Sequence, residues 1–383
     1  MNIDILVIGA GASGLAAGIA SAKHSRETVC VVERNTEPGR KFLLSGSGQC
    51  NVTHTGQIAD FLNHYGDTKK ARFVKPALFS FDNIAVMRFF EQQGISFLKR
   101  EDGKIFPKSL KSNDLLNIFV SEFRRYGGIL QTETVVKNVS KNDAGFLLTT
   151  NRGEFRAKKV ILATGGQSYP STGSQGDGFR FAVQLGHHLV PPKPALTPII
   201  VRNYLFADLS GISFWSAKIE IYRNGKQLKR GQGDVLLTHR GLSGPGILNL
   251  SRYMESGDEL RIALVEPQKF VPHIFSGKKT LKNALQSFGL AERFLIRIIE
   301  SISVALDQLV AEINRETRKK IESALTSYRF VIESLCGWNE AMVTAGGVKL
   351  DEVNRQTMES RIVHGLYFCG ELLDIDGDTG GYN

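Results

Sequence analysis

The chain has 383 residues, of which 42% are hydrophobic and 22% are charged, and this balance excludes a largely disordered or fibrous protein. The length is enough for two or three domains with a sizeable core. Four cysteines without CxxC spacing exclude a disulfide framework and an electron-shuttling dithiol, so we expect a reduced, cytoplasmic protein.

The formal net charge is +10, which suits anionic cofactors and substrates and also nucleic acids. The basic residues are spread along the sequence in short groups, which favours a solvated surface, so we expect nucleic acid not to be a partner. The apolar stretch from Ile3 to Ala22 is interrupted by Asp4 and by glycines, so no membrane span is expected. The histidines and cysteines lack the spacing of metal ligands, which predicts no metal site.

Residues 1–33 have the pattern strand, glycine turn, helix, strand. Ile5–Ile8 and Thr28–Val32 are apolar runs typical of parallel strands that are buried on both faces. Gly9–Gly14 has the GxGxxG spacing of a turn that holds a pyrophosphate at a helix N-terminus. Glu33 ends the second strand, where a carboxylate accepts hydrogen bonds from an adenosine ribose. This unit predicts a dinucleotide site.

Residues 34–56 are predicted to form a long glycine-rich loop. Its basic pair Arg40-Lys41 could neutralise a pyrophosphate, and the glycines of Ser45–Asn51 would allow backbone contact with a flat ring system. Two amphipathic helices are predicted next, from about Asn83 to Gln93 and from near Asn113 to Gly127-Gly128.

Strand-like segments at 129–133, 135–139 and 145–150 predict a small antiparallel piece. From about residue 197 to 265 the sequence alternates as short strands do, and from about 279 to 328 it has a helical pattern. From Ala341 onward, strand-like segments that end in glycine occur again. These shifts predict a first domain of residues 1–196 with 336–383, and an inserted domain of residues 197–335 that is β-rich and then helical.

Two further strands end in glycine. Lys159–Ala163 leads into Thr164-Gly165-Gly166, and Gly365–Cys369 leads into Gly370-Glu371, whose carboxylate could bind the hydroxyls of a ribityl chain. Ligands of doubly wound sheets bind at the carboxyl ends of strands, so three such ends indicate one extended cofactor. FAD fits this pattern better than a mononucleotide.

The segments GAGASG, PGRK, SGSGQCN, ATGGQSYPSTGSQGDG, LLTHRGLSGPGIL and GLYFCGELLDIDGDTGGYN occur in this order. Together they resemble the YhiN/BaiN-type family of bacterial FAD-dependent oxidoreductases over essentially the whole chain. The resemblance implies the fold class α/β, with a Rossmann-like FAD-binding domain of the glutathione-reductase superclass and an inserted mixed β/α domain. Relatives reduce conjugated double bonds of steroid-like substrates with NAD(P)H or carry an oxidase label.

We predict that FAD is held by residues of these segments and their flanks. They are Gly9, Gly11, Ala12, Ser13, Gly14, Glu33, Arg34, Arg40, Lys41, Ser47, Asn51, Val136, Ala163, Thr164, Gly165, Gly370, Glu371, Gly380, Gly381, Tyr382 and Asn383.

The sequence departs from the family at two places. Gln49 stands where the family has an arginine, which removes a positive charge from the flavin loop. The family also continues after the asparagine equivalent to Asn383 into a helix aimed at the flavin pyrimidine. Either the sequence is truncated at Asn383, or we expect the flavin half of FAD to be held less firmly than in the relatives.

No second GxGxxG segment occurs, so NAD(P)H, if it is the donor, would bind transiently in the substrate cleft. Tyr169, His239 and Arg240 are candidate substrate-side residues, although a structural role is the alternative for each. The leading hypothesis is an FAD-dependent oxidoreductase that acts on a small organic molecule. The alternatives are a tRNA-modifying flavoprotein, suggested by the charge, and a relic of the fold with weak FAD binding. The oligomeric state is left open.

Overall fold

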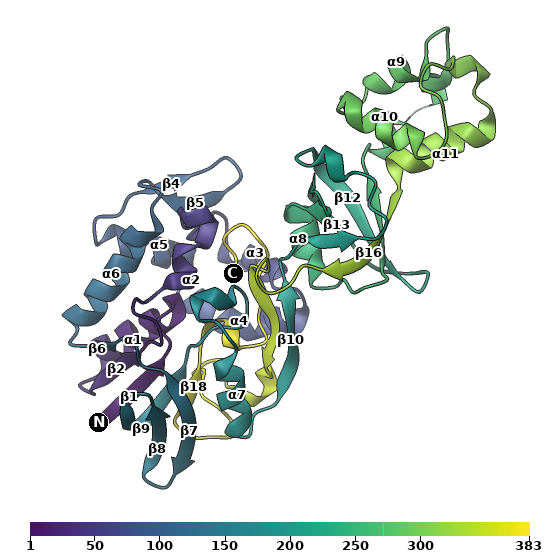
Figure 1. Cartoon of the computed structure of the whole chain (residues 1–383). Helices are drawn as coiled ribbons and strands as arrows, with labels where there is room; N and C mark the ends of the chain where they lie inside the picture. Colours follow the sequence, from purple (N-terminus) through teal and green to yellow (C-terminus); the bar gives the residue numbers. More distant parts are fainter. Residues whose placement is uncertain (271) are drawn as a thin grey trace. The chain divides into compact units, whose positions relative to one another are not determined.

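The computed structural model describes residues 1–270 and 272–383 (Figure 1). The chain divides into two compact units. Met1–Pro194 and Met342–Asn383 form the first unit, and Ala195–Ala341 form the second. Each unit has a hydrophobic core. The domain limits expected from the sequence, 1–196 with 336–383 and 197–335, stay a prediction.

The first unit is built on a sheet in the order β6-β2-β1-β9-β8-β7, with β18 also paired to β9. Strands β6, β2, β1, β9 and β18 are mutually parallel, so their carboxyl ends lie at one edge of the sheet. The strands are β1 (Asn2–Ile8), β2 (Val29–Val32), β6 (Ile129–Gln131), β7 (Val136–Asn142), β8 (Gly145–Thr150), β9 (Gly153–Leu162) and β18 (Leu366–Phe368).

Both faces of this sheet are covered. On one face, Val7 and Val31 pack in a cluster with Leu15 of α1 (Ala12–His24) and Phe123 of α6 (Ser112–Arg125). On the other face, the core includes Phe181 of α7 (Asp177–Gln184). Because successive side chains of a strand point to opposite faces, the continuous apolar runs of β1 and β2 serve both layers. Each fully buried large apolar side chain contributes roughly 1.5–3 kcal/mol.

Several local predictions are confirmed. The two amphipathic helices are α5 (Asn83–Glu91) and α6, and Asp82 caps α5 by accepting a hydrogen bond from the Ala85 amide at 2.7 Å. A further helix, α4 (Thr68–Ser80), is missing from the prediction because Pro76 lies inside it, where proline normally ends a helix. Strands β7 and β8 form the predicted antiparallel pair.

The prediction for residues 129–133 is wrong in one respect. Strand β6 does not join the antiparallel piece, because it pairs in parallel with β2, with Ile129 opposite Cys30. The intervening chain includes α6, and a parallel pairing requires a long crossover connection of this kind.

The first unit also contains two small sheets and several short helices. One sheet has the order β3-β5-β4, and β10 pairs with β17 in the other. Their bounds are β3 (Thr53–His54), β4 (Phe97–Lys99), β5 (Lys104–Pro107), β10 (Leu189–Ala195) and β17 (Val343–Val348), and the helices are α2 (Arg40–Leu43) and α3 (Ile58–Phe61). The predicted loop 34–56 therefore contains α2 and β3.

The second unit contains a closed barrel in the order β11-β14-β13-β12-β15-β16. Inward side chains such as Ile219, Ile221 and Ile262 are fully buried. The strands are β11 (Ile199–Val201), β12 (Ser213–Arg223), β13 (Lys226–Leu237), β14 (Gly241–Ser243), β15 (Glu259–Ala263) and β16 (Tyr328–Leu335). The helices are α8 (Pro245–Ser251), α9 (Leu281–Gln286), α10 (Glu292–Glu300) and α11 (Arg315–Thr326). The mostly parallel sheet and this second unit confirm the predicted α/β fold class with a mixed β/α part.

None of the helices in the described part of the chain combines the length and the apolar run that crossing a bilayer requires. Among residues 1–270 and 272–383, no three His, Cys, Asp or Glu side chains gather as metal ligands.

A buried histidine ties the end of α7 to the segment before β18. His187 Nε2 lies 2.8 Å from Ser360 Oγ, and His187 Nδ1 lies 3.1 Å from Glu352 Oε2. Ser360 Oγ already accepts hydrogen bonds from the amides of Ile362 and Val363 at 3.0 and 2.7 Å. Its only hydrogen therefore goes to Nε2, which makes His187 the Nδ1–H tautomer. Despite its serine–histidine–glutamate order, this cluster is structural, because Ser360 has no lone pair left for attack.

This arrangement makes stability depend on pH. Burial lowers the pKa of His187 below its usual value of about 6.5, so the unfolded chain binds the proton first as pH falls. Stability from His187 is present above about pH 6.5 and is lost as pH falls through the lower folded pKa. The difference in unfolding free energy between wild type and His187→Gln should shrink by up to about 1.4 kcal/mol per pH unit between pH 7 and pH 5. Urea titrations measure it, and a constant difference would contradict this account.

Candidate cofactor site

The turn between β1 and α1 is shaped by two glycines that have no room for a side chain. A Cβ atom at Gly9, which has a φ of +105°, would lie 2.6 Å from the carbonyl oxygen of Ala163. A Cβ atom at Gly14 would lie 1.9 Å from the carbonyl oxygen of Gly9. At Gly11, by contrast, a Cβ atom would meet no described atom within 4 Å. The turn is tight on its protein side and open at Gly11, where a pyrophosphate would approach.

Helix α1 begins at this opening. Gly11 is its N-cap and supplies no side-chain hydrogen bond to the first turn. Ala12 and Ser13 form the start of the helix, where backbone N–H groups have no partner within the helix and the dipole is positive. The protein therefore leaves this helix end to be completed by an anion.

Glu33 lies at the carboxyl end of β2 and is 8% exposed. Its Oε2 accepts a hydrogen bond from the Ala10 amide at 2.9 Å. Its Oε1 accepts from the Asn35 backbone amide at 3.0 Å and from Asn35 Nδ2 at 2.7 Å. A carboxylate offers about four acceptor positions, so Oε2 keeps one for a ribose hydroxyl.

Two other predicted residues flank Glu33. Arg34 forms an ion pair with Asp177 at 2.6 Å, which joins the end of β2 to the start of α7. The amide of Thr134 donates to the carbonyl oxygen of Glu33 at 2.8 Å. The chain that leads into Val136, which is buried in β7, therefore runs beside the carboxyl end of β2.

The first unit contains a polar network in which the buried Ser168 and Thr344 contact the partly buried Lys41 and Glu371. Lys41 Nζ donates to Ser168 Oγ at 2.9 Å and also pairs with Glu371 Oε2. Glu371 Oε1 accepts from Ser168 Oγ at 3.0 Å and from the Thr344 amide at 2.8 Å. Four segments that are distant in sequence thus fix the direction of the Glu371 carboxylate. The charges of Lys41 and Glu371 neutralise each other.

The carboxyl ends of β9 and β18 reach the same turn. A Cβ atom at Gly370, whose φ is +73°, would lie 2.5 Å from Ser13 Oγ. Ala163 contacts Gly9 and Gly14, as the glycine distances show. Thr164 and Gly165 follow Ala163 directly. The three strand ends that the sequence predicts to be adjacent are brought together.

The loop Ser45–Asn51 is compact. Ser47 has a φ of +56°, and a Cβ atom at Gly46 would lie 2.8 Å from the Asn51 amide nitrogen. Asn51 Oδ1 is buried and has no hydrogen-bond partner among the described residues. Burial raises the pKa of the neighbouring Cys50 thiol to about 11, so it stays protonated and serves packing. The orphaned Asn51 oxygen fits a donor group of a bound cofactor.

The segment Gly380–Asn383 packs against β3. A Cβ atom at Gly381 would lie 2.5 Å from the Thr53 backbone. The Tyr382 ring is sandwiched between His64, at 3.7 Å, and His54, at 4.9 Å between ring centroids. Both faces of the ring are therefore covered, so Tyr382 can meet a flavin through its backbone or ring edge but cannot stack on it. Asn383 Oδ1 accepts from the Gly377 amide at 2.9 Å.

The contacts of the three candidate substrate-side residues do not indicate a role in substrate binding. Tyr169 has a φ of +51° and accepts a hydrogen bond from the Thr172 amide through its carbonyl oxygen, as a turn residue does. His239 and Arg240 are exposed in the second unit, and Arg240 pairs with Glu340 at 2.8 Å. Their substrate roles stay predictions.

Sequence reasoning missed several residues at this site. Thr344 carries no local signal, because its contact with Glu371 depends on the pairing of distant segments. A second missed group is an ion cluster in which Lys70 Nζ contacts Asp374 Oδ1 at 2.9 Å and Asp376 Oδ1 at 2.7 Å. Asp376 is completely buried. The DID sequence just before GDTGGYN could have suggested that a cation was needed.

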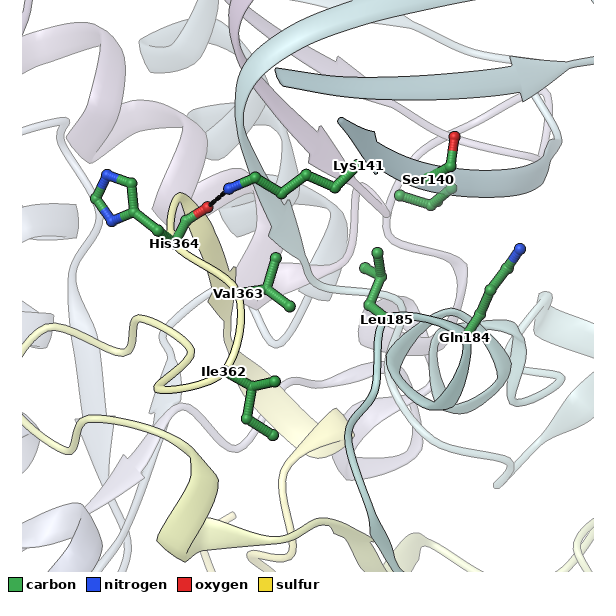
Figure 2. Close-up of a pocket in the computed structure, with 8 residues that line it drawn as sticks. Ser140, Lys141, Gln184, Leu185, Ile362, Val363 and His364 are labelled. Carbon is green, nitrogen blue, oxygen red and sulfur yellow. Dashed lines mark hydrogen bonds between the residues drawn. The ribbon is translucent and has the colours of Figure 1, made fainter. Parts of the chain in front are cut away.

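A pocket of about 540 Å³ lies elsewhere in the first unit. Figure 2 shows residues that line it. Its lining includes Gln184 of α7 and Ile362 and His364 of the loop before β18, and Lys141 Nζ donates to the His364 carbonyl oxygen. That loop precedes β18, whereas Gly370 follows it. The cavity therefore lies at the opposite edge of the sheet from the strand ends described above.

Comparison with known proteins places this fold in a family. Residues 3–383 match the family described as "HI0933-like protein Rossmann domain". The ribosomal RNA dihydrouridine synthases of Haemophilus influenzae and Escherichia coli K12 are 31% and 29% identical, over 99% and 100% of this chain and 94% of each relative. The 3-dehydro-bile acid delta(4,6)-reductase of Clostridium scindens is 30% identical over 98% of this chain and 94% of its own.

The glycine geometry separates cofactor binding from folding. Gly11→Ala meets no described atom, so the variant should keep its stability but lose FAD, because a methyl group would occupy the pyrophosphate approach. Gly14→Ala should lower the free energy of unfolding by about 1–3 kcal/mol through overpacking. Thermal unfolding and FAD titration measure the two effects. Tight FAD binding by Gly11→Ala would contradict the assignment.

Proposed function

This chain belongs to the HI0933-like family and is an FAD-dependent oxidoreductase, and we propose that it reduces a carbon–carbon double bond conjugated to a carbonyl group, with NAD(P)H as donor. The names of the relatives support this chemistry. A 3-dehydro-bile acid delta(4,6)-reductase acts on double bonds near a 3-oxo group, and dihydrouridine is uridine whose C5–C6 double bond, next to a carbonyl, is reduced.

The observation that carries the proposal is the convergence of three parallel strand ends on one turn. The open turn at Gly11 and the N-terminus of α1 would hold the pyrophosphate, and Glu33 would hold the adenosine ribose. Glu371 would bind the ribityl hydroxyls, and Asn51 would accept a hydrogen bond near the ring. When bound, the flavin accepts an electron pair from the donor and delivers it to the substrate.

The two basic residues of α2 would have different roles. Lys41 is bound to Glu371 and Ser168, so it orients the carboxylate and adds little net charge. Arg40 is exposed and its Nη1 contacts Asn35 Oδ1 at 3.2 Å, so its charge is free to attract phosphate. We therefore expect Arg40 to attract the phosphates of the cofactor and Lys41 to position the Glu371 carboxylate.

The net reaction is balanced by the donor and one proton. A hydride from NAD(P)H is added to the carbon β to the carbonyl, and a proton from water is added to the α carbon, which gives NAD(P)⁺ and the saturated bond.

Two substrate classes present this double bond. A small organic enone is the first candidate and is favoured by the bile acid reductase. A uridine in RNA is the second, favoured by the two ribosomal RNA dihydrouridine synthases and by the charge of +10. Because these relatives act on ribosomal RNA, the second candidate replaces the tRNA hypothesis.

The donor is tested by anaerobic reduction. Protein loaded with FAD should lose its visible flavin absorbance on addition of NADH or NADPH. Gly11→Ala treated identically is the control and should show no bound flavin. Protein that binds FAD but is reduced by neither nucleotide would contradict the proposed donor, and protein that never binds FAD would support the relic hypothesis.

The substrate class is tested with the reduced enzyme. A 3-oxo-Δ4 steroid and a ribosomal RNA fragment are supplied in parallel, and mass spectrometry detects the gain of two hydrogens in either product. Reduction of one of them identifies the class. Reoxidation by oxygen alone, with neither substrate reduced, would contradict a reductase.

A further inference from the structure

Trp215 lies on β12 of the barrel and is 80% exposed. The residues on either side of the irregularity, Phe214 and Ala217, are each 5% exposed and point into the barrel. The pairing of β12 with β13 shifts between them, so Trp215 and Ser216 form a bulge. A bulge re-aims the side chains of a strand. Here it holds the largest apolar side chain in water.

The bulge is fixed by hydrogen bonds. The Ser216 amide donates to Asp234 Oδ1 at 2.8 Å, and Ser216 has a φ of +52°. Gln232 Nε2 donates to the carbonyl oxygen and to Oγ of Ser216, at 3.0 and 2.9 Å. The exposure of Trp215 is therefore built into the strand pair and does not result from a loose loop.

The same hairpin is rich in basic residues. The segment Ser213–Leu237 has five basic residues, Lys218, Arg223, Lys226, Lys229 and Arg230, and two acidic ones, Glu220 and Asp234. Arg223 pairs with Asp258, and Lys229 lies over the Tyr253 ring. Within the part of the chain that the structure describes, Lys218, Lys226 and Arg230 form no ion pair.

The two carboxylates of the hairpin are already engaged. Asp234 accepts from the Ser216 amide, and Glu220 accepts from Tyr222 OH and Gln227 Nε2, both at 3.0 Å. Glu220 nevertheless lies opposite Arg230 on one neighbouring strand. Lys218 and Arg230, which form no ion pair in the described part of the chain, thus share the outer face of the hairpin with Trp215.

Barrel pairing extends this surface. Glu220 also lies opposite Arg261 on β15, and Arg261 lies opposite Arg329 on β16. Neighbouring strands are about 4.8 Å apart, so cations distant in sequence become neighbours. Arg261 and Arg329 share Glu259, which leaves positive charge in excess along this row.

We propose that the outer face of the β12–β13 hairpin, formed by Trp215, Lys218, Arg230 and Gln232, is a contact surface for single-stranded RNA. Unpaired bases stack on aromatic side chains while basic side chains contact the phosphates. This combination fits RNA better than an apolar protein partner, because an apolar partner would have to desolvate Lys218 and Arg230 on the same face. The inference rests on the RNA form of the proposed function.

The proposed RNA surface disagrees with the expectation, drawn from the sequence, that nucleic acid is not a partner. That expectation was based on cations spread along the sequence. Antiparallel pairing brings Lys218 next to Gln232 and places Arg230 two residues away along the neighbouring strand. Clustering of this kind arises from strand register and is invisible in a linear count of charges.

The test uses the full-length, FAD-loaded protein and a short fluorescein-labelled single-stranded RNA of mixed sequence. Trp215→Ala should weaken binding by about 5- to 150-fold, the range for loss of one stacked base. Arg230→Gln and Lys218→Gln should each lower the slope of log affinity against log salt by about 0.7. Fluorescence anisotropy at several salt concentrations measures both.

Lys320→Gln is the matched control, because Lys320 is an exposed lysine of the same unit that pairs with Glu316 at 3.0 Å. Its affinity and slope should equal those of wild type. The chain has two tryptophans, so Trp338→Phe leaves Trp215 as the only indole and its quenching by RNA as a direct readout.

Absence of RNA binding by the wild type, or equal affinity of Trp215→Ala and Lys320→Gln, would overturn the inference. Self-association that is abolished by Trp215→Ala would also overturn it, in favour of a protein interface. Reduction of the flavin by NAD(P)H is measured on the same samples. RNA binding can therefore fail while the proposed chemistry stands, and the two failures are distinguishable.

Discussion

A Cβ atom at Gly14 would lie 1.9 Å from the carbonyl oxygen of Gly9, so α1 can begin directly on the turn after β1 only because this residue has no side chain. The same turn admits the Ala163 carbonyl against Gly9 and Gly370 against Ser13. Three strand ends thereby reach one helix N-terminus. The close contact between Gly14 and Gly9 thus positions the parts of the candidate site. They are the open face at Gly11, the carboxylate of Glu33 and the polar network at Glu371.

The features that could be predicted from the sequence are those encoded locally. Strand β1, the glycine turn and Glu33 lie within one short segment whose spacing reflects a single steric requirement. The position of Thr344 could not be predicted, because it depends on the meeting of segments far apart in the chain. The stacking of Tyr382 between two histidines could not be predicted either, because His54 and His64 are far from Tyr382 in the sequence. Helix α4 escaped prediction because Pro76 opposes the local preference and tertiary packing of Phe73 and Val74 outweighs it.

Charge is arranged differently in the two units. Within the first unit, several basic residues are neutralised by nearby carboxylates, as Lys41 is by Glu371 and Lys70 is by Asp374 and Asp376. The buried cluster at Lys70 is costly to desolvate and would be destabilising if one partner were removed, so it specifies the position of the segment before Gly380. On the barrel hairpin, Lys218 and Arg230 form no ion pair with any described residue and share a face with the exposed Trp215 indole. The net charge of +10 therefore does not show how charge is distributed in either unit.

The pairing of β18 with β9 has a consequence for biosynthesis. Strand β18 and Gly370-Glu371 belong to the first unit, yet the ribosome makes them after the whole of the second unit. The barrel contains its own core and can close as soon as β16 emerges, whereas the earlier sheet must wait for its last parallel strand. Until then, Val160–Leu162 of β9 lack the partner that β18 provides, and the proposed adenosine end of the cofactor site exists without the proposed ribityl end. The nascent protein would thus pass through a state that can recognise adenosine before it can hold a flavin.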